Sequence, residues 1–580
     1  MRSQNKTNAI FLIGAFVAMG LVWHRALFGV DVTDESFWIA EPFLVTKGAV
    51  PFADLWIQSP STSLLIAPFV SLYELFAHER DGIYIYMMHI AVLFRAVVSL
   101  LIYIALKKRM DLAAAGAIPL AMFCCAMGRL KVLNYNMLSL YLLALAGALI
   151  LDALQELKTA KAALLYGLTG IIMAGCALAH ISQIINCAFF AVLLLCLERR
   201  RVKGVPLWCI YVLSGFAVAL LTVIGMEAAS GGKLFSGLAI LLKNNNYFEI
   251  PKLPFWTQVM RSLYDLKAFG LPGFMCFCAI LGMLYLFSQH NTDFREDLKK
   301  NCILSFAGSA CALLGGLALK VGEYSSDYST FILYLTVPVL LLVIEQKDRS
   351  VFYWLMIFWV PCLLSWLSVS IIAYAPANYR YYTMTTGALL YIPLLSRTAK
   401  SAFTKTHVGN AVTFLLTVCF MFSFLVASYR SIYSDDPIEY LDYRIESGVY
   451  KGMITSYERG KRIEQLETAI REATANTDSL LISDLFPMGY LMADSVPFTP
   501  TTWDPPLYRG GFRDMNLLQA YFDMKGTIPD KILFVNSEGI PLSIDDPESE
   551  FSIFVKNHYV CTKRIGEGQF SMRVYEKVHD

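Results

Sequence analysis

The stretch that organises this chain lies between its first two long apolar segments and reads DVTDESFW at residues 31–38 and GAVPFADLWIQSP at residues 48–60. It places three aspartates and a glutamate beside tryptophan and phenylalanine rings, where an apolar segment ends. Carboxylates next to hydrocarbon are costly unless they are paired, hydrated or functional. Such a site raises carboxylate pKa values by desolvation, which suits a general base. The alternative is an acidic loop that only keeps helix ends hydrated.

The composition is that of a membrane protein. Of 580 residues, 56% are hydrophobic and 16% are charged, and the mean hydropathy is +0.52, which excludes an ordinary soluble globule. The formal net charge of +2 provides no basic footprint for nucleic acid. The 13 cysteines fall almost entirely in apolar segments and show no spacing typical of zinc sites or disulfides.

The apolar residues gather in segments of about 20, the length of helix that crosses a hydrocarbon core of about 30 Å. We therefore predict a polytopic α-helical membrane protein with about 13 spans. No small-residue cleavage site precedes Asp31, so the first segment is interpreted as a retained helix. The predicted spans are 9–29, 83–106, 112–128, 135–154, 162–180, 183–197, 206–228, 269–288, 302–320, 329–344, 351–373, 383–396 and 411–428.

The basic residues between these segments predict the orientation of the chain. Clusters such as 107–109, 199–203 and 397–400 all fall on one side of the predicted bundle. By the positive-inside rule this side is cytoplasmic, so the N-terminus lies inside and the C-terminus outside. We expect a multi-pass protein of the plasma membrane whose first loop and tail share the extracytoplasmic side.

Two parts of the first loop are too short to be comfortable spans. Residues 35–46 set aromatic and leucine side chains against Glu35 and Glu41, and residues 61–77 are interrupted by Pro68. Both are predicted to be juxtamembrane helices lying in the interface plane.

The chain changes character near residue 430, so we predict a membrane core over 1–430 and a soluble α/β domain over 431–580. A charged amphipathic helix is predicted over 454–475. The apolar runs 479–484 and 531–536 are predicted to be buried strands, and residues 551–556 continue as helix. Residues 559–564 and 570–576 are predicted to pair as a terminal hairpin.

The first loop resembles that of GT-C superfamily glycosyltransferases. The resemblance lies in the acidic pair Asp34-Glu35, in Gly48-x-x-Pro51-aromatic-x-Asp54 and in a proline before the next helix. It is strongest for the branch that holds protein O-mannosyltransferases and the bacterial aminoarabinose transferase. The resemblance implies a GT-C membrane enzyme that moves a sugar from a polyprenyl-phosphate carrier to a hydroxyl of a glycan, lipid or protein acceptor outside the cytoplasm.

The same resemblance assigns roles to the acidic residues. Asp34 is the expected general base, and Glu35 is expected to orient it or to bind sugar or metal, although Asp31 is close enough to confuse the alignment. Asp54 is a second candidate for a sugar or acceptor contact, and capping of the turn after Pro51 explains it equally well. No cofactor is implied with certainty, and a divalent cation stays open.

Cations are needed to hold the lipid phosphate. Many relatives carry a lysine or proline where this chain has Ser59, so the phosphate-binding set must differ here. The expected replacements are Arg129 and Lys131 in a short turn, and Arg380 with Tyr381 at the start of a late span. Arginine presents a planar, bidentate fork to phosphate oxygens. The alternative for each is an interfacial cation within an aromatic belt.

His180 lies in a tight external turn, where it either reaches the cavity or serves as a satisfied polar core group. Two other functions stay open for the whole chain. A transporter or flippase of a lipid-linked or small polar solute would carry its functional charges mid-span and show an inverted repeat. Here the acidic residues of the first loop cluster at one surface, and no inverted repeat is visible. A non-catalytic glycan-binding relative is consistent with the departure at Ser59.

Overall fold

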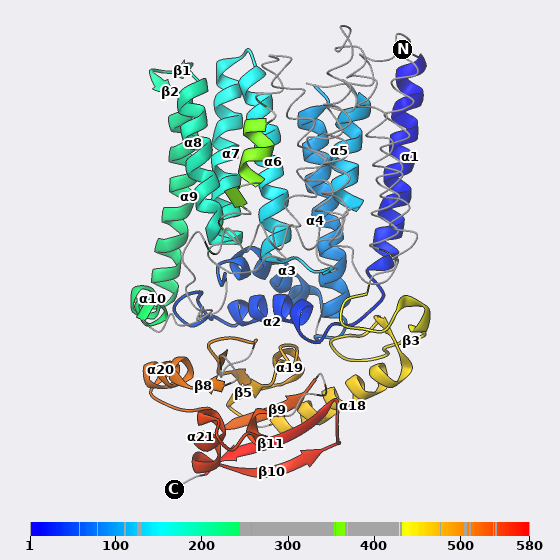
Figure 1. The fold of residues 1–580 in the computed structure, drawn as a ribbon, viewed down its shortest axis with the longest axis vertical. Coiled ribbons are helices and arrows are strands. Elements are labelled where there is room, and N and C mark those ends of the chain that lie inside the picture. The colour runs from blue at the N-terminus through cyan, green and yellow to red at the C-terminus, as the bar shows by residue number, and fades with distance from the viewer. Residues whose placement is uncertain are drawn as a thin grey trace.

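A bundle of helices lies above two helices that run across its lower end, and an α/β domain lies below these two helices (Figure 1). This computed structural model describes most of the N-terminal half and of the tail. The described residues are 2–243 except 57–58, 78, 109–111 and 125–129; single positions at 257 and 429; part of 353–368; and 432–578 except 476, 504–506, 510–511, 538 and 540–541.

The helices of the bundle follow the predicted apolar segments closely. Four of the described helices, α4, α6, α7 and α9, are long and apolar enough to cross a membrane. The predicted spans from 269 to 344 and from 383 to 428 lie outside the described residues, so the count of about 13 stays a prediction. The bundle contains α1 (Arg2–Arg25), α4 (Ile83–Leu106), α5 (Leu112–Cys124), α6 (Tyr135–Gln155), α7 (Thr159–Ala179), α8 (Ile184–Leu197), α9 (Leu207–Ala229), α10 (Leu234–Lys243) and a π-helical turn, Leu355–Trp359.

Helices form at both predicted juxtamembrane segments, as α2 (Asp34–Thr46) and α3 (Thr62–Phe76). Figure 1 shows them lying across the lower ends of the bundle helices. The hydroxyls of Ser61 and Thr62 donate to the carbonyls of Leu178 and Ala179, at 2.7 Å and 2.6 Å. Because the last carbonyls of a helix lack intrahelical partners, these bonds both satisfy the end of α7 and fix the start of α3.

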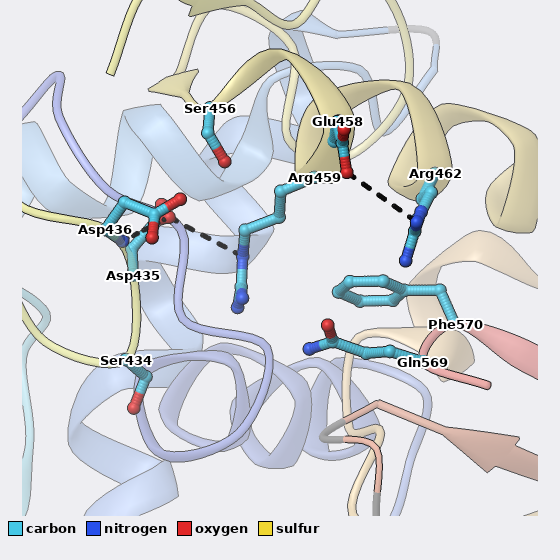
Figure 2. A pocket seen from close by; sticks show the side chains of 9 residues that line it. All are labelled: Ser434, Asp435, Asp436, Ser456, Glu458, Arg459, Arg462, Gln569 and Phe570. Atoms are coloured by element: carbon cyan, nitrogen blue, oxygen red, sulfur yellow. Dashed lines mark hydrogen bonds and ion pairs between the residues drawn. The ribbon is translucent and has the colours of Figure 1, made fainter. Parts of the chain in front are cut away.

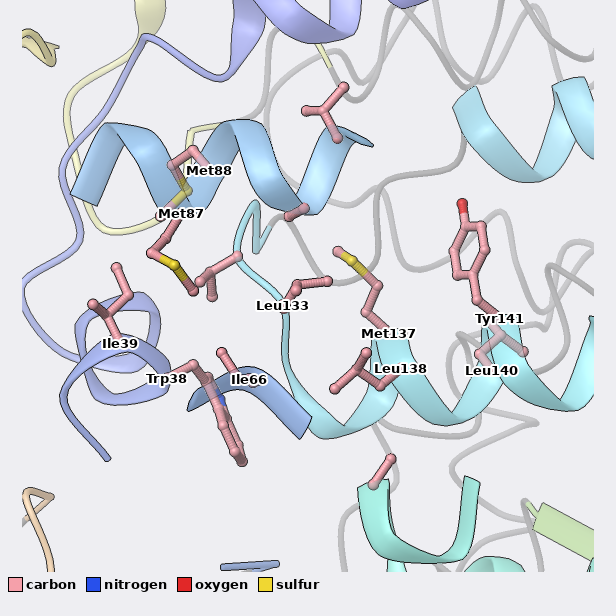
Figure 3. Packing of buried hydrophobic residues seen from close by; sticks show 14 of the residues in the cluster. Trp38, Ile39, Ile66, Met87, Met88, Leu133, Met137, Leu138, Leu140 and Tyr141 are labelled. Carbon is pink, nitrogen blue, oxygen red and sulfur yellow. The ribbon is translucent and has the colours of Figure 1, made fainter. Parts of the chain in front are cut away.

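The acidic side chains of α2 are buried. Glu35 is fully buried and accepts from Lys131 N–H, whereas Glu41 is 1% exposed and accepts from Thr502 N–H of the C-terminal domain. The position of α2 in the interface plane of the membrane stays a prediction. The apolar face packs where α2, α3, α4 and α6 meet, around side chains that include Trp38, Ile66 and Met87 (Figure 3).

The C-terminal domain is built on a five-stranded sheet with the strand order β10-β11-β9-β5-β6. The neighbouring strands β5 and β9 are parallel, whereas β11 is antiparallel to both β9 and β10. The five strands are β5 (Ser479–Ser483), β6 (Val496–Pro497), β9 (Lys531–Asn536), β10 (Tyr559–Ile565) and β11 (Ser571–Lys577). Short two-stranded pairs are β1 (Arg201–Val202) with β2 (Val205–Pro206), β3 (Tyr443–Arg444) with β4 (Ile454–Thr455), and β7 (Leu507–Arg509) with β8 (Phe512–Asp514).

Helices cover both faces of this sheet. Alternate residues of a strand point to opposite faces, so neighbouring residues of β5 pack against different helices. Leu480 and Ile482 belong to the core that contains the apolar face of α18 (Tyr457–Thr474), whereas Leu481 packs with α20 (Asn516–Lys525) and α21 (Glu550–His558). The predicted helix, strands and terminal hairpin of the tail are confirmed. The sequence interpretation missed α20 and the short helix α19 (Gly489–Met492).

Candidate functional site

The first loop is held at both ends by the segment that leads into the C-terminal domain. At its start, Gly29 N–H donates to the carbonyl of Ile454 and Ile454 N–H donates to the carbonyl of Leu27, both at 2.8 Å. At its end, Gly82 N–H donates to the carbonyl of Gly448 at 2.9 Å. These backbone bonds fix the geometry of the acidic stretch from outside the loop.

Asp31 shapes the start of α2. Its carboxylate accepts hydrogen bonds from the N–H groups of Thr33 and Glu35, at 3.0 Å and 2.6 Å, and from the Thr33 hydroxyl at 2.8 Å. A side chain that accepts from the first N–H groups of a helix is a cap. Burial and the neighbouring Glu35 raise the pKa of Asp31 to about 7, against the opposing effect of these hydrogen bonds. Asp31 therefore has a structural task.

Glu35 and Lys131 form a buried pair. Lys131 N–H donates to one carboxylate oxygen of Glu35 at 2.6 Å, and the Tyr84 hydroxyl donates to the other. The Lys131 ammonium lies 3.7 Å from Glu35 and donates to the carbonyls of Phe28 and Gly29, both at 2.7 Å. The side chains are 0% and 11% exposed. Burial lowers the pKa of Lys131 to about 8. The ammonium of Lys131 thus points into the protein.

Asp34 is different from its acidic neighbours. Throughout residues 30–44, all of which the structure describes, it is the one residue that is not buried. The hydroxyl of Tyr433 donates a hydrogen bond to its carboxylate. Burial of part of the side chain raises the pKa of Asp34 above its usual range, the Tyr433 hydrogen bond opposes this, and Glu35 adds to it. Asp34 is accessible and has a raised pKa, as proton transfer requires.

Asp54 connects the loop with the C-terminal domain. One oxygen accepts from Val50 N–H at 2.8 Å and the other pairs with the Lys525 ammonium at 2.8 Å. Nearby, Trp56 is 1% exposed and stands edge-on to the ring of Tyr521, with centroids 5.6 Å apart. Both carboxylate oxygens of Asp54 are thus engaged, one of them in the turn-capping alternative.

His180 lies at the end of α7 and is buried. The Ser182 hydroxyl lies 2.7 Å from its Nδ1, and the Tyr135 ring contacts it in a tilted arrangement with centroids 5.1 Å apart. These contacts fit a satisfied polar core group. Arg129, Arg380 and Tyr381 lie outside the described residues, so their expected contacts with lipid phosphate stay predictions.

The described residues do not form a metal site. Within the described part of the chain, no group of three or more His, Cys, Asp or Glu side chains is placed to hold a metal ion. Asp31, Asp34 and Glu35 are close in sequence, but the carboxylate oxygens of Asp31 and Glu35 accept hydrogen bonds from N–H and O–H groups.

The contacts of two residues, Tyr433 and Glu41, escaped the sequence interpretation. Tyr433 follows the last predicted span and carries no motif, so only the fold reveals its contact. Glu41 accepts from Thr502 N–H at 2.7 Å and from the Thr501 hydroxyl at 3.1 Å, while its second oxygen has no hydrogen-bond partner among the described residues. Burial raises the pKa of Glu41 to about 7.

No protein-family model matches the sequence, and no curated protein does. Solved structures show partial likeness. The oligosaccharyltransferase of Archaeoglobus fulgidus, tethered to an acceptor peptide with the NVT sequon, is 10% identical at a TM-score of 0.45, over 99% of this chain and 74% of its own. ArnT from Cupriavidus metallidurans in the apo state is 14% identical at a TM-score of 0.42, over 99% and 98% of the two chains.

A further structure of the Archaeoglobus fulgidus enzyme AglB, in complex with an inhibitory peptide and a dolichol-phosphate, is 10% identical at a TM-score of 0.44, over 91% of this chain and 69% of its own. AglB and ArnT are both GT-C superfamily glycosyltransferases.

Proposed function

We propose that this chain is a membrane glycosyltransferase that moves a sugar from a polyprenyl-phosphate carrier to an acceptor hydroxyl on the extracytoplasmic face, with Asp34 as general base. The observation that carries the proposal is the partial exposure of Asp34 within a stretch whose other residues, from 30 to 44, are buried. Asp31 and Glu35 support it, because their carboxylates are already engaged by hydrogen bonds at the first turn of α2.

The chemistry requires one proton acceptor. Asp34 accepts the proton of the acceptor hydroxyl as that oxygen forms a bond to C1 of the donor sugar. The bond between C1 and the phosphate oxygen breaks, and polyprenyl phosphate leaves with the electron pair. Asp34 is also the first residue of α2, where the positive end of the helix dipole stabilises a carboxylate and where its partial burial opposes that effect. A single displacement of this kind inverts the configuration at C1.

The lipid phosphate needs a separate cationic site. Lys131 was expected to contribute, but its ammonium is occupied by Glu35 and two carbonyl groups. We therefore assign this role to Arg380 and Arg129, together with Tyr381, which follows Arg380 in the sequence. The transporter alternative gains no support from Asp34 and Glu35, because both belong to α2, which lies across the lower end of the bundle and not within a predicted span (Figure 1).

The test is transfer by the purified chain from a panel of polyprenyl-phospho-sugars, comparing wild type with Asp34→Asn. Asparagine is nearly isosteric but accepts no proton, so turnover should fall by ~10²–10⁴-fold while donor binding is retained. Asp442→Asn, at an exposed position of the tail, is the matched control and should transfer normally. If Asp34→Asn turns over the donor at a near wild-type rate, Asp34 is not the general base. If wild type transfers sugar from no donor in the panel, the transporter alternative is favoured.

A further inference from the structure

A polar cavity of about 350 Å³ lies where the first loop meets the C-terminal domain. We call it the junction pocket. It is bounded by the segment 434–436, by the first turns of α18 and by the tip of the β10–β11 hairpin (Figure 2). Its volume falls in the range of roughly 300–1,000 Å³ that is typical of small-molecule sites.

One wall of the pocket is rigid. The Asp435 side chain is fully buried and accepts from Val30 N–H at 2.8 Å and from the Thr455 hydroxyl at 2.7 Å. Arg459 donates to the Val30 carbonyl at 3.1 Å and covers the ring of Phe570, with its guanidinium carbon 5.5 Å from the centroid. Its Nε lies 3.8 Å from the Asp435 carboxylate, and this ion pair fixes the guanidinium in the pocket wall.

The opposite side offers side chains of mixed character. Arg462 is half-exposed and lies 3.7 Å from Glu458. Gln569 donates through its amide nitrogen to the Ser537 carbonyl at 3.1 Å, which orients the amide. Figure 2 shows Arg459, Arg462, Gln569 and Phe570 gathered around one space. The pocket therefore presents guanidinium, amide and carboxylate groups together with an aromatic ring.

This mixture identifies the ligand class. Every sugar hydroxyl both donates and accepts, so a saccharide uses guanidinium and carboxylate groups at the same time. A phosphate would meet three carboxylates against two guanidinium groups, and the excess negative charge opposes it. We propose that the junction pocket binds a sugar unit of the acceptor, so that the acceptor of this enzyme is a glycan. The assignment rests on the proposed transferase function.

The position of the pocket fits an acceptor. Tyr433, which donates to Asp34, directly precedes Ser434 in the pocket wall. Val30, which is bonded to both Asp435 and Arg459, lies four residues before Asp34. The pocket wall and the proposed base are thus connected through residues 433–434 on one side and through residues 30–34 on the other. We expect a glycan bound in the pocket to extend its next hydroxyl towards Asp34.

Saccharide binding can be measured without transfer. The full chain in a sugar-free detergent would be titrated with methyl glycosides of hexoses, N-acetylhexosamines and hexosamines, followed by saturation-transfer NMR. Wild type should bind at least one of them saturably. Arg462→Gln and Gln569→Ala should each weaken it by about tenfold, the effect of losing one hydrogen bond to a charged or buried polar group. Arg471→Gln is the control, because it breaks the same i, i+4 type of pair on α18 outside the pocket.

The proposal is overturned if wild type shows no saturable saccharide binding, or if both pocket variants bind saccharide as wild type does. Binding of inorganic phosphate that is lost in the same variants would also overturn it, in favour of an anion site. Asp34→Asn separates this question from the transferase function. It should bind saccharide as wild type does while failing to transfer, and the pocket variants should raise the acceptor KM with donor affinity unchanged. Transfer with a normal acceptor KM in the pocket variants refutes the pocket and leaves the transferase intact.

Discussion

The hydroxyl of Tyr433 donates a hydrogen bond to the carboxylate of Asp34, 399 residues earlier in the chain. The contact joins the segment leading into the C-terminal domain to the first turn of α2, and places a neutral donor against the proposed base. Asp31 and Glu35 bond to groups within the loop, its neighbouring helices and Lys131. The C-terminal domain is thereby part of the environment of Asp34.

Removal of this hydroxyl should change the pH dependence of transfer. A hydrogen bond to the charged form of a carboxyl lowers its pKa, so Tyr433→Phe should raise the pKa of Asp34 further. The acidic limb of the kcat/KM profile should therefore move to higher pH, because the charged form of Asp34 loses a hydrogen bond. Tyr440→Phe, at an exposed tyrosine of the same segment, is the control. An unchanged acidic limb would separate Asp34 from the proton transfer.

Glu41 should make thermal stability depend on pH. Its folded pKa of about 7 lies above its ordinary value of 4.5, so the folded state binds the extra proton between these values. The contribution of Glu41 to stability is therefore present at low pH and falls by up to about 1.4 kcal/mol per unit as pH rises towards 7. Asp31 and Glu467 act in the same direction, with pKa values raised to about 7 and about 6.

Glu41→Gln removes one of these three contributions while keeping an acceptor for Thr502 N–H. In a thermal-shift series, the apparent melting temperature of this variant should rise relative to that of wild type as the pH is raised from 5 to 8. If the difference between the two proteins is the same at both pH values, Glu41 does not titrate in this window.

Lys131→Met should destabilise the fold instead of only weakening donor affinity. The substitution leaves Glu35 as a fully buried carboxylate without its cation, which costs about 3–5 kcal/mol in comparable buried pairs. The double variant Lys131→Met/Glu35→Gln removes that uncompensated charge and should recover much of the loss. The measurement is the apparent melting temperature of each variant. A stable Lys131→Met with weakened donor binding would restore Lys131 as a phosphate ligand.

Gly448→Ala tests the attachment of the C-terminal domain to the start of α4. Gly448 has a φ of +79°, and an added Cβ would lie 1.9 Å from Oε2 of Glu467, a buried carboxylate that also holds Val449 N–H. Strain and displacement together should lower stability by more than the roughly 1–3 kcal/mol of backbone strain alone. Gly526→Ala, at φ +71° with open space around it, isolates the strain. Equal losses in the two variants would show that Glu467 moves aside freely.

The sidedness of the site can be tested by cysteine labelling in a Cys-less background. Asp442→Cys in the tail and Lys158→Cys in the turn between α6 and α7 are both exposed and lie at opposite ends of the molecule. An impermeant maleimide should label position 442 in intact cells and position 158 only after permeabilisation, following the positive-inside rule. The reverse pattern would place Asp34 in the cytoplasm.

The secondary-structure elements that depend only on local residue patterns could be predicted from the sequence. The strand over 531–536 and the span over 83–106 match β9 and α4 at both ends, because each is a run of apolar residues of the length its environment requires. The sequence set Glu41 opposite the apolar side chains of its segment, but helical periodicity cannot reveal that another domain covers that face. The acidic pair at 34–35 was visible, but the division between a partly exposed Asp34 and a buried Glu35 depends on Tyr84, Lys131 and Tyr433, which are distant in sequence.

The backbone bonds between residues 27–29 and Ile454, and between Gly82 and Gly448, impose an order on biosynthesis. A ribosome that adds about 5–20 residues per second takes roughly 20–80 s to advance from Asp34 to its partner 399 residues later. During that interval the acidic loop has emerged but lacks its tyrosine, its backbone clamps and the junction pocket. The site is completed only when the end of the chain has been made and has folded back, so a nascent or truncated polypeptide carries its carboxylates without the means to use them.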